Sequence, residues 1–310
     1  MKFIIFGGSG SFGTAMTKKI LNDDINNTVT IFSRNEKLQF EHKSKFNSPR
    51  IKYIIGDIRD IDAVHEAFEI DKYDYVFLAA AMKAINMCEA NPLECIKTNI
   101  DGCINVINEA INHNVKKLVF LLTDKAVNPT TLYGVCKLTV EAYIKHVNNK
   151  NTDLIRTRYG NVFGSSHSVA WIFNKLAKEG KPLTVTNPDM TRFFMKLDEA
   201  VELVWTANEK GVNGDLWVYN NKACTIKELA DAFSDNQIVN GLRCIEKNDE
   251  ALLATYELDH SERMGNYYRI NDSIPITERH NKPLTSDNCE RLTHEELLDL
   301  IADWRQHYEV

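Results

Sequence analysis

Five residues able to do acid–base and redox chemistry lie together in the segment "TDKAVNPTTLYGVCK" (123–137). Tyr133 and Lys137 form the pattern YxxxK, which places both side chains on one face of a helix. A lysine one turn from a tyrosine stabilises the phenolate and lowers a pKa that is ordinarily about 10. The tyrosinate can then remove a proton from an alcohol hydroxyl that shares a hydrogen bond with Thr123. These residues predict oxidation of an alcohol.

Asp124 and Lys125 add an acid and a base that alcohol oxidation alone does not need. Once a sugar carries a ketone at carbon 4, the proton on carbon 5 becomes acidic. Lys125 can remove that proton while Asp124 protonates the hydroxyl that leaves carbon 6. The alternative is a solvated surface ion pair. The catalytic interpretation is favoured because the pair follows an apolar run, and ligands bind outside the carboxyl ends of strands in open α/β sheets.

The elements that must position these residues alternate along the first half of the chain. Apolar, β-rich runs separated by helical patterns are expected to form six strands, at 2–6, 28–33, 51–56, 73–81, 116–123 and 153–164. Such strands indicate a parallel sheet covered on both faces, and the usual handedness of the connections favours an α/β, Rossmann-like, doubly wound fold. Near the end, Thr293 and Glu296 have capping-box spacing before an amphipathic helix.

Beyond about residue 160 the pattern loosens, and Gly, Pro and Asn become more frequent. We therefore expect residues 1–160 to form a cofactor-binding domain, with 190–212 returning to it. Residues 161–310 are expected to form mainly a smaller substrate-binding domain.

Composition restricts the classes of partner. The chain has 310 residues, 44% hydrophobic and 26% charged, with a formal net charge of −6. This charge argues against general binding of nucleic acid or anionic membranes, which need a basic face. We find no signal peptide and no apolar window long enough to span a membrane. The seven cysteines include no CxxC pair, so we expect reduced core thiols, no metal site and a cytoplasmic location.

A glycine-rich turn follows the first expected strand, in "FGGSGSFGTAM". Gly7, Gly10 and Gly13 have the spacing GxxGxxG, and Ser11 and Phe12 lie between them. Glycines permit the tight turn and the close approach of the backbone to a pyrophosphate, and the helix N-terminus supplies N–H groups for the phosphates. An ordinary turn would explain the glycines alone. Their position between strand and helix favours dinucleotide binding and gives weight to YxxxK, which also arises by chance on helices.

The ends of the second and third strands indicate which dinucleotide is bound. An NAD enzyme usually has an acid after the second strand, but this chain has "FSRNEK". Ser33, Arg34 and Lys37 can bind a 2′-phosphate, which favours NADP over NAD; the alternative is a solvated basic turn. In "GDIRD", Asp57 and Ile58 are expected beside the adenine, unless Asp57 is only a helix N-cap.

Small side chains end the fourth strand, in "LAAAMK". Ala79, Ala80 and Ala81 allow the backbone to lie along the pyrophosphate and the nicotinamide ribose. Close strand–helix packing would also require small residues, and the two interpretations are compatible.

Taken together, these motifs resemble a known family. "GGSGSFG", "FSRNEKLQ", "GDIRD", "TDKAVNPTTLYGVCK", "RYGNVFGSSHSV" and "MTRFFMKLDEAV" are similar to the extended short-chain dehydrogenase/reductases. More narrowly, the chain resembles the configuration-inverting UDP-N-acetylglucosamine 4,6-dehydratases of pseudaminic acid and capsule biosynthesis, nearly from end to end. The string "TDKAVNP…YG" is the most specific part, since related 4-epimerases lack the acid–base pair and retaining dTDP-glucose dehydratases have Asp-Glu there.

The resemblance implies roles for individual residues. Asp124, Lys125 and Tyr133 correspond to the catalytic trio, supported by Thr123 and Lys137. Positions bordering the cofactor or the sugar nucleotide are Lys83, Asn99 and Asn161, and the expected substrate contacts also include Arg192, Arg243 and Glu246. Arginine suits the diphosphate because its planar fork pairs well with phosphate oxygens.

Two departures from the family pattern lie on the substrate side. "GLRCIEK" stands where the family has "GxRPGEK", so Cys244 and Ile245 replace Pro and Gly. "SSHSV" stands where the family has "SRGSV"; His167 there is either a ligand contact or an exposed loop residue.

The sequence thus predicts an NADP-dependent UDP-N-acetylglucosamine 4,6-dehydratase that inverts carbon 5. It would oxidise carbon 4, eliminate water across carbons 5 and 6, and return the hydride to carbon 6. A retaining dehydratase and a 4-epimerase are the nearest alternatives, and a non-catalytic NADP-binding sensor or scaffold is an alternative of another class. A UDP-sugar is the expected partner, in a homo-oligomer.

Overall fold

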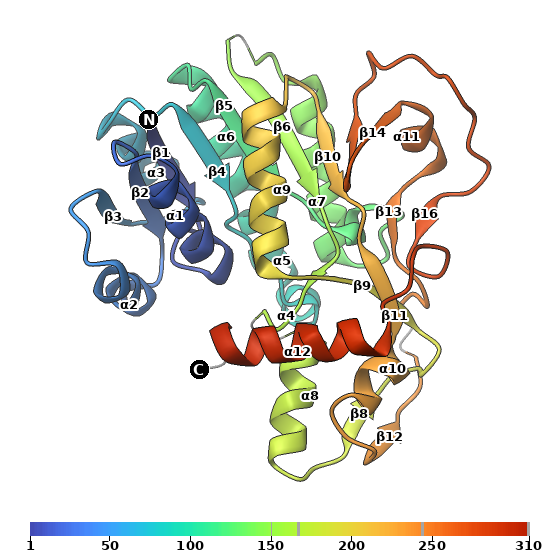
Figure 1. Ribbon diagram of the computed structural model, residues 1–310. Helices are drawn as coiled ribbons and strands as arrows, with labels where there is room; N and C mark the ends of the chain where they lie inside the picture. Colours follow the sequence, from blue (N-terminus) through green and yellow to red (C-terminus); the bar gives the residue numbers. More distant parts are fainter. Residues whose placement is uncertain (150, 166–167, 243–244, 309–310) are drawn as a thin grey trace.

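A nine-stranded sheet forms the centre of the computed structural model, which describes residues 1–149, 151–165, 168–242 and 245–308 (Figure 1). The strand order is β14-β15-β10-β6-β5-β4-β1-β2-β3. All neighbouring pairs from β3 to β10 are parallel, and β15 pairs antiparallel with both β10 and β14. The strands are β1 (Lys2–Phe6), β2 (Thr28–Ser33), β3 (Ile51–Ile55), β4 (Tyr75–Leu78), β5 (Lys117–Leu121), β6 (Asp153–Arg158), β10 (Leu216–Tyr219), β14 (Ser261–Met264) and β15 (Tyr267–Ile270).

Alternating side chains of these strands fill two cores, one on each face of the sheet. Ile4 and Phe6 pack with α3 (Ile61–Glu69), α6 (Gly102–Asn112) and α7 (Leu132–His146). Phe3 and Ile5 point to the other face and pack with α1 (Ser11–Asp23) and α9 (Leu197–Lys210), the two helices in front of the sheet in Figure 1. Because both faces are buried, the strands are continuously apolar, as the sequence predicted for a doubly wound α/β fold.

The remaining elements form smaller sheets and a third core beside the carboxyl ends of the central strands. The small sheets are β11-β9-β7, β12-β8 and β13-β16. Their strands are β7 (Asn161–Val162), β8 (Leu183–Val185), β9 (Thr191–Met195), β11 (Lys222–Thr225), β12 (Gln237–Val239), β13 (Ala251–Leu253) and β16 (Leu284–Thr285). The other helices are α2 (Glu36–Phe46), α4 (Ile85–Ala90), α5 (Pro92–Ile96), α8 (Val169–Lys178), α10 (Ile226–Asp231), α11 (Thr255–Asp259) and α12 (His294–Tyr308). Helices α8, α10 and α12 share one apolar cluster.

Two features differ from the sequence-based expectation. The expected strand 153–164 is wrong as one element, because the chain leaves the central sheet after Arg158 and resumes as β7 in a small sheet. Gly160 makes this change of sheet possible, since a Cβ atom there would lie 2.4 Å from the Cβ of Phe193. The central sheet also gains three strands from beyond residue 210, which the loosened pattern did not predict.

The capping box expected before the last helix is confirmed. The Thr293 backbone N–H donates to Glu296 and the Glu296 N–H donates to the Thr293 hydroxyl, which is the predicted capping box. Of the six described cysteines all are free thiols, and five of them are buried. No helix in the described part of the chain combines the length and apolarity that crossing a bilayer requires.

A buried ion cluster fixes helix α7 against the sheet. Glu141 of α7 accepts from Arg156 at 3.0 Å and from Arg158 at 2.9 Å, both on β6. Arg158 also pairs with Glu257 of α11 at 2.8 Å. Removing one member of such a cluster leaves a buried charge uncompensated, which typically costs about 3–5 kcal/mol. The cluster therefore holds the helix that carries Tyr133 and Lys137 in one position.

Candidate active site

A cleft of about 990 Å³ lies at the carboxyl ends of the central strands, where the small sheets meet the large one. Its lining includes the turns after β1, β2, β3, β4 and β5, helix α7, and segments beyond residue 158. This is the position at which open α/β sheets bind ligands.

The turn after β1 forms a cradle that side chains would fill. Gly7 has φ of +86°, and a Cβ there would lie 2.7 Å from the backbone nitrogen of Ala80. Gly13 lies inside α1, and its Cβ would lie 2.3 Å from the carbonyl oxygen of Gly8, so it permits close packing and does not line the cleft. Gly10 is the N-cap of α1, and the lining includes Gly7, Gly10, Ser11 and Phe12. The cradle and the helix N-terminus fit a dinucleotide pyrophosphate.

The residues after β2 differ in how they face the cleft. The Ser33 hydroxyl lies 2.8 Å from that of Ser9 and accepts from Gln39 at 3.0 Å. Arg34 lines the cleft with about half of its side chain exposed, which leaves its guanidinium open to an anion. Lys37 pairs with a neighbour on the exposed side of α2 and does not line the cleft. Of the three predicted phosphate ligands, the structure brings only Ser33 and Arg34 to the cleft.

The Asp57 carboxylate interacts with two neighbouring arginines, Arg59 and Arg34. Its carboxylate accepts from Arg59 at 2.6 Å and lies 3.5 Å from Arg34. Burial alone would raise the pKa of Asp57, but the hydrogen bonds from Arg59 and the charges of both arginines lower it overall. Asp57 does not line the cleft, whereas the next residue, Ile58, does. Asp57 is also not an N-cap, because Asp60 fills that position of α3.

A buried asparagine, Asn99, holds the loop after β4 by hydrogen bonds. The cleft is lined here by Ala79, Ala80, Ala81 and Lys83. The walls of the cleft partly desolvate the Lys83 ammonium and so lower its pKa. The Lys83 side chain nevertheless stays accessible to water. Asn99 is fully buried in a π-helical turn, Lys97–Asp101, and does not line the cleft. Its amide accepts from the Met82 N–H and donates to the Met82 carbonyl, both at 2.8 Å. Asn99 therefore holds the loop in position.

The acid–base pair lies directly after β5. The Lys125 ammonium donates to the Asp124 carboxylate at 2.9 Å and to Asn161 of β7 at 3.3 Å. The Thr123 hydroxyl also donates to the same Asp124 oxygen, at 2.9 Å. Asp124 is fully buried, and its second oxygen has no hydrogen-bond partner among the described residues. Thr123 and Lys125 line the cleft and lie between Asp124 and the space for a ligand.

Tyr133 and Lys137 lie on one face of α7, but their interaction differs from the prediction. Burial raises the pKa of Tyr133, and nearby Tyr159 and Asp124 raise it further, while a hydrogen bond with Thr123 lowers it. The Lys137 ammonium donates to the Leu121 carbonyl at 2.9 Å, and burial lowers its pKa. The predicted effect of Lys137 on the Tyr133 pKa is not seen in this structure, because the Lys137 ammonium is bound to a carbonyl and burial raises the pKa of Tyr133. The role of Tyr133 as a phenolate stays a prediction.

Tyr159 is a cleft residue to which the sequence interpretation gave no role. It lies between β6 and β7 and lines the cleft close enough to Tyr133 to raise the pKa of that phenol. Burial raises the pKa of Tyr159 itself. Its position within the quoted motif "RYGN" was the only available signal, because a single tyrosine after a strand has no spacing pattern.

The opposite wall of the cleft includes β7, β8, β9, helix α8 and residues 245–250. Arg192 of β9 donates to the carbonyls of Lys247 and Asn248, both at 2.8 Å, so its fork holds this segment in place. Asn161 donates to the Phe193 carbonyl at 3.1 Å. Both residues and Glu246 line the cleft, and their contact with a substrate stays a prediction. Arg243, Cys244 and His167 lie outside the described residues.

Comparisons with known proteins cover nearly the whole chain. The family model described as "Polysaccharide biosynthesis protein" matches residues 3–272. A UDP-glucose 4-epimerase of Rickettsia massiliae is 40% identical over 96% of this chain and 94% of its own length. The inverting UDP-N-acetylglucosamine 4,6-dehydratase of Campylobacter jejuni is also 40% identical, over 90% of this chain and 85% of its own length.

Solved structures share the fold. The structure of Pen from Bacillus thuringiensis has a TM-score of 0.91 and 32% identity, covering 98% of this chain and 97% of its own. DesIV, a dTDP-glucose 4,6-dehydratase from Streptomyces venezuelae, has a TM-score of 0.75 at 16% identity and covers 99% of this chain and 98% of its own. The names of the two 40% identical relatives divide between an epimerase and a dehydratase, so the chemistry has to be argued from the site.

Proposed function

We infer the function of this chain from the family to which it belongs: it is a polysaccharide biosynthesis protein of the extended short-chain dehydrogenase/reductase type, among the sugar-nucleotide dehydratases and epimerases. Within that family we propose a 4,6-dehydratase that acts on UDP-N-acetylglucosamine and inverts carbon 5. The product is a UDP-2-acetamido-2,6-dideoxy-L-arabino-hex-4-ulose.

One observation carries the choice of dehydration. The Asp124–Lys125 pair lies beside Thr123 at the bottom of the cleft, and Lys125 reaches Asn161 on the opposite wall. Epimerisation at carbon 4 needs only the threonine, tyrosine and lysine that handle the hydroxyl. Elimination of water needs one more base and one more acid, and this pair supplies both.

The residues divide the chemistry among themselves. Tyr133, acting as the phenolate, takes up the proton of the hydroxyl on carbon 4 while Thr123 hydrogen-bonds to that hydroxyl. Lys137 fixes the end of β5 by its hydrogen bond to the Leu121 carbonyl. The chemistry supplied by a bound nicotinamide is reversible hydride transfer with carbons 4 and 6 of the sugar. Within the ion pair, the Lys125 ammonium first passes one proton to the Asp124 carboxylate, 2.9 Å away, which leaves a neutral amine and a carboxylic acid. The Lys125 amine then removes the proton from carbon 5, and the electrons of that bond form the double bond to carbon 6 as its hydroxyl departs.

Asp124 supplies the proton that turns the leaving hydroxyl into water. Because Asp124 is buried, its proton reaches the cleft through the Thr123 hydroxyl, 2.9 Å away. Support for inversion comes from the Campylobacter jejuni relative, which is named as an inverting enzyme. We also propose that residues 161–310 mainly bind the UDP-sugar, with Asn161, Arg192, Arg243 and Glu246 as its contacts.

We propose NADP as the cofactor. Arg34 offers a half-exposed guanidinium at the edge of the cleft, and the nearby Asp57 carboxylate is already bound to Arg59. An arginine that faces the ribose favours a 2′-phosphate. Supporting this proposal, the glycine cradle fits a dinucleotide. Equilibrium binding should favour NADP over NAD in wild type, and Arg34→Ser should remove most of that preference.

The second candidate is a sugar-nucleotide 4-epimerase, favoured by the name of the Rickettsia massiliae relative. In an epimerase, Asp124 and Lys125 would form an ion pair that takes no part in catalysis. A retaining dehydratase would use the same elimination but return the proton to the original face of carbon 5.

Proton NMR of the purified protein with UDP-N-acetylglucosamine in heavy water separates these candidates. We expect a 6-deoxy-4-keto sugar with deuterium at carbon 5 and the coupling constants of the L-arabino configuration. Retained configuration would overturn inversion, and a carbon-4 epimer alone would overturn dehydration.

A further inference from the structure

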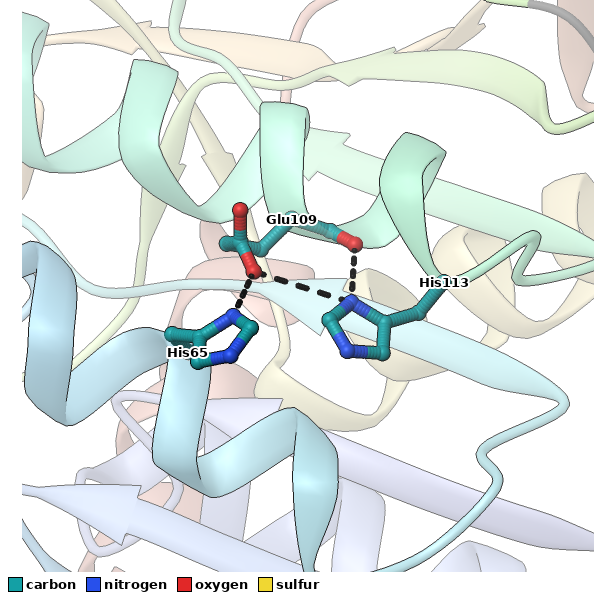
Figure 2. A group of neighbouring side chains, drawn as sticks. All are labelled: His65, Glu109 and His113. Atoms are coloured by element: carbon teal, nitrogen blue, oxygen red, sulfur yellow. Dashed lines mark hydrogen bonds and ion pairs between the residues drawn. The ribbon is translucent and has the colours of Figure 1, made fainter.

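A cluster of histidines and glutamates joins two helices away from the cleft (Figure 2). His65 lies on α3, and Glu109 and His113 lie at the end of α6, with the three side chains pointing toward one another. Nδ1 of His65 lies 2.7 Å from Oε2 of Glu109, and Nδ1 of His113 lies 3.6 Å from the same oxygen. None of these residues lines the cleft.

The spacing of these three atoms fits a small divalent cation. One ligand atom from each residue lies within 4.8 Å of the other two. A tetrahedral zinc ion with bonds of about 2.0–2.1 Å needs its nitrogen and oxygen ligands roughly 3.3 Å apart. The measured separations of 2.7 and 3.6 Å fall on either side of that value. Small rotations of the rings would complete three corners of the tetrahedron and leave the fourth to water.

The outer contacts are those of a metal site. Nε2 of His113 lies 2.9 Å from a carboxylate oxygen of Glu69, one turn after His65 on α3. Histidines that bind metals usually donate their other N–H to a carboxylate in this way. Asn112 donates to the second oxygen of Glu109 at 3.0 Å and so orients that carboxylate. Nδ1 of His113 now faces the Glu109 carbonyl at 2.9 Å, and it must turn from this carbonyl to bind an ion.

Burial and access also suit an ion. The Glu109 side chain is only 10% exposed, whereas that of His65 is 54% exposed, so a cation can enter from solvent and bind a largely buried carboxylate. Imidazole and carboxylate ligands together are typical of zinc and its neighbours in the first transition series.

We propose that His65, Glu109 and His113 bind a divalent transition-metal ion such as Zn²⁺, with Glu69 orienting His113, and that the ion clamps α3 to α6. Spacing along the chain did not indicate this site, because the two halves are separate i, i+4 pairs on helices brought together only by the fold. The proposal does not depend on the sugar substrate or on the reaction.

Calorimetric titration of tag-free, metal-stripped full-length protein with Zn²⁺ tests the site. We expect one ion per chain and a higher melting temperature on binding. His65→Ala should abolish both effects and should fold normally, since its side chain is exposed. Glu69→Gln should weaken binding by roughly 10–100-fold, as loss of a partner that orients a ligand does elsewhere.

His146→Ala is the matched control. His146 lies at the end of α7 and contacts a carbonyl four residues earlier at 2.8 Å, as His113 does, but among the described residues it forms no ion pair with a carboxylate. This variant should bind Zn²⁺ like wild type. Co²⁺ substitution should give a visible spectrum without thiolate bands, which rules out the cysteines as ligands.

Three results would contradict the proposed metal site. If wild type binds no Zn²⁺, if His65→Ala binds it as tightly as wild type, or if the Co²⁺ spectrum shows thiolate ligation, the proposed site is wrong.

Discussion

The two walls of the cleft are built in different ways. The first wall consists mainly of turns that continue directly from β1, β2, β3, β4 and β5, neighbouring strands of one sheet. The second wall includes β7, β9 and residues 245–250, which side chains hold across long separations in sequence. Lys247 donates to the Val127 carbonyl at 3.2 Å and Thr130 donates to the Ile245 carbonyl at 2.9 Å.

The two walls should therefore respond differently to amino-acid substitutions. The shape of the first wall follows from strand register and backbone packing, so a misplaced atom there disturbs the sheet itself. The second wall depends on a small number of hydrogen bonds, each worth about 0.5–1.5 kcal/mol. Substitutions in the first wall should therefore affect cofactor binding and stability together, and those in the second should affect mainly the substrate.

The largest effect is expected where the two walls meet, at Asp124. Asp124→Asn keeps the shape of the side chain but removes the acid and the charge that faces Lys125. Loss of a general acid typically costs about 10²–10⁴-fold in rate, and we expect product formation to fall by that amount. Progress curves by NMR measure it, with equilibrium binding of NADP as the control. A wild-type rate would show that the pair is a bystander, as the epimerase alternative requires.

A smaller but still large effect is expected from Gly7→Ala in the first wall. The new methyl group would lie 2.7 Å from the Ala80 nitrogen, in a residue with positive φ. We expect NADP affinity to fall at least about tenfold, equivalent to about 1.4 kcal/mol, because the cradle must open. Melting temperature and fluorescence titration measure the two consequences.

Gly180→Ala is the control for Gly7→Ala. Gly180 also has positive φ, at +64°, but its Cβ would meet nothing within 4 Å. It should show only the backbone strain, about 1–2 kcal/mol, with unchanged NADP affinity. Equal losses of NADP affinity in the two variants would contradict a cradle shaped by close approach.

The same difference between the walls explains how much the sequence predicted. The strand-turn-helix at Gly7 and the YxxxK helix are local patterns, so the α/β fold and much of the first wall followed from them. The hydrogen bonds that Arg192 donates to the carbonyls of residues 247 and 248 join segments more than 50 residues apart, and no local pattern encodes them. The prediction that Lys37 faces the cleft was wrong, because its position at the start of α2 does not determine which side of the helix its side chain faces.

Arg192→Lys tests the second wall. Lysine cannot reproduce the fork that binds the carbonyls of Thr191, Lys247 and Asn248. Losing one or two such bonds should raise KM for the UDP-sugar by about five- to tenfold, with kcat nearly unchanged. Steady-state kinetics separate the two constants. A loss of NADP affinity of similar size would mean that the two walls are not independent.

The smallest effect is expected from pH, at the back of the first wall. His42 of α2 is buried against Tyr53 at 2.8 Å, and burial, together with the charge of Lys45, lowers its pKa from 6.5 to about 4. Its second ring nitrogen has no partner among the described residues, so a proton there would be a buried, unpaired charge.

Because the folded pKa is depressed, the unfolded chain binds more protons between pH 6.5 and 4. The stability due to neutral His42 is therefore complete above pH 6.5 and is lost progressively as the pH falls toward 4. Between pH 7 and 6 the loss should be less than about 1 kcal/mol.

Urea denaturation at several pH values measures this loss, and His42→Gln should flatten the profile while the exposed control His146→Gln should not. Hydrogen exchange should place the acid-induced opening in α2 and β3 and not in the second wall. Opening that begins in the second wall would show that its few hydrogen bonds, and not a buried histidine, set the acid limit of the fold.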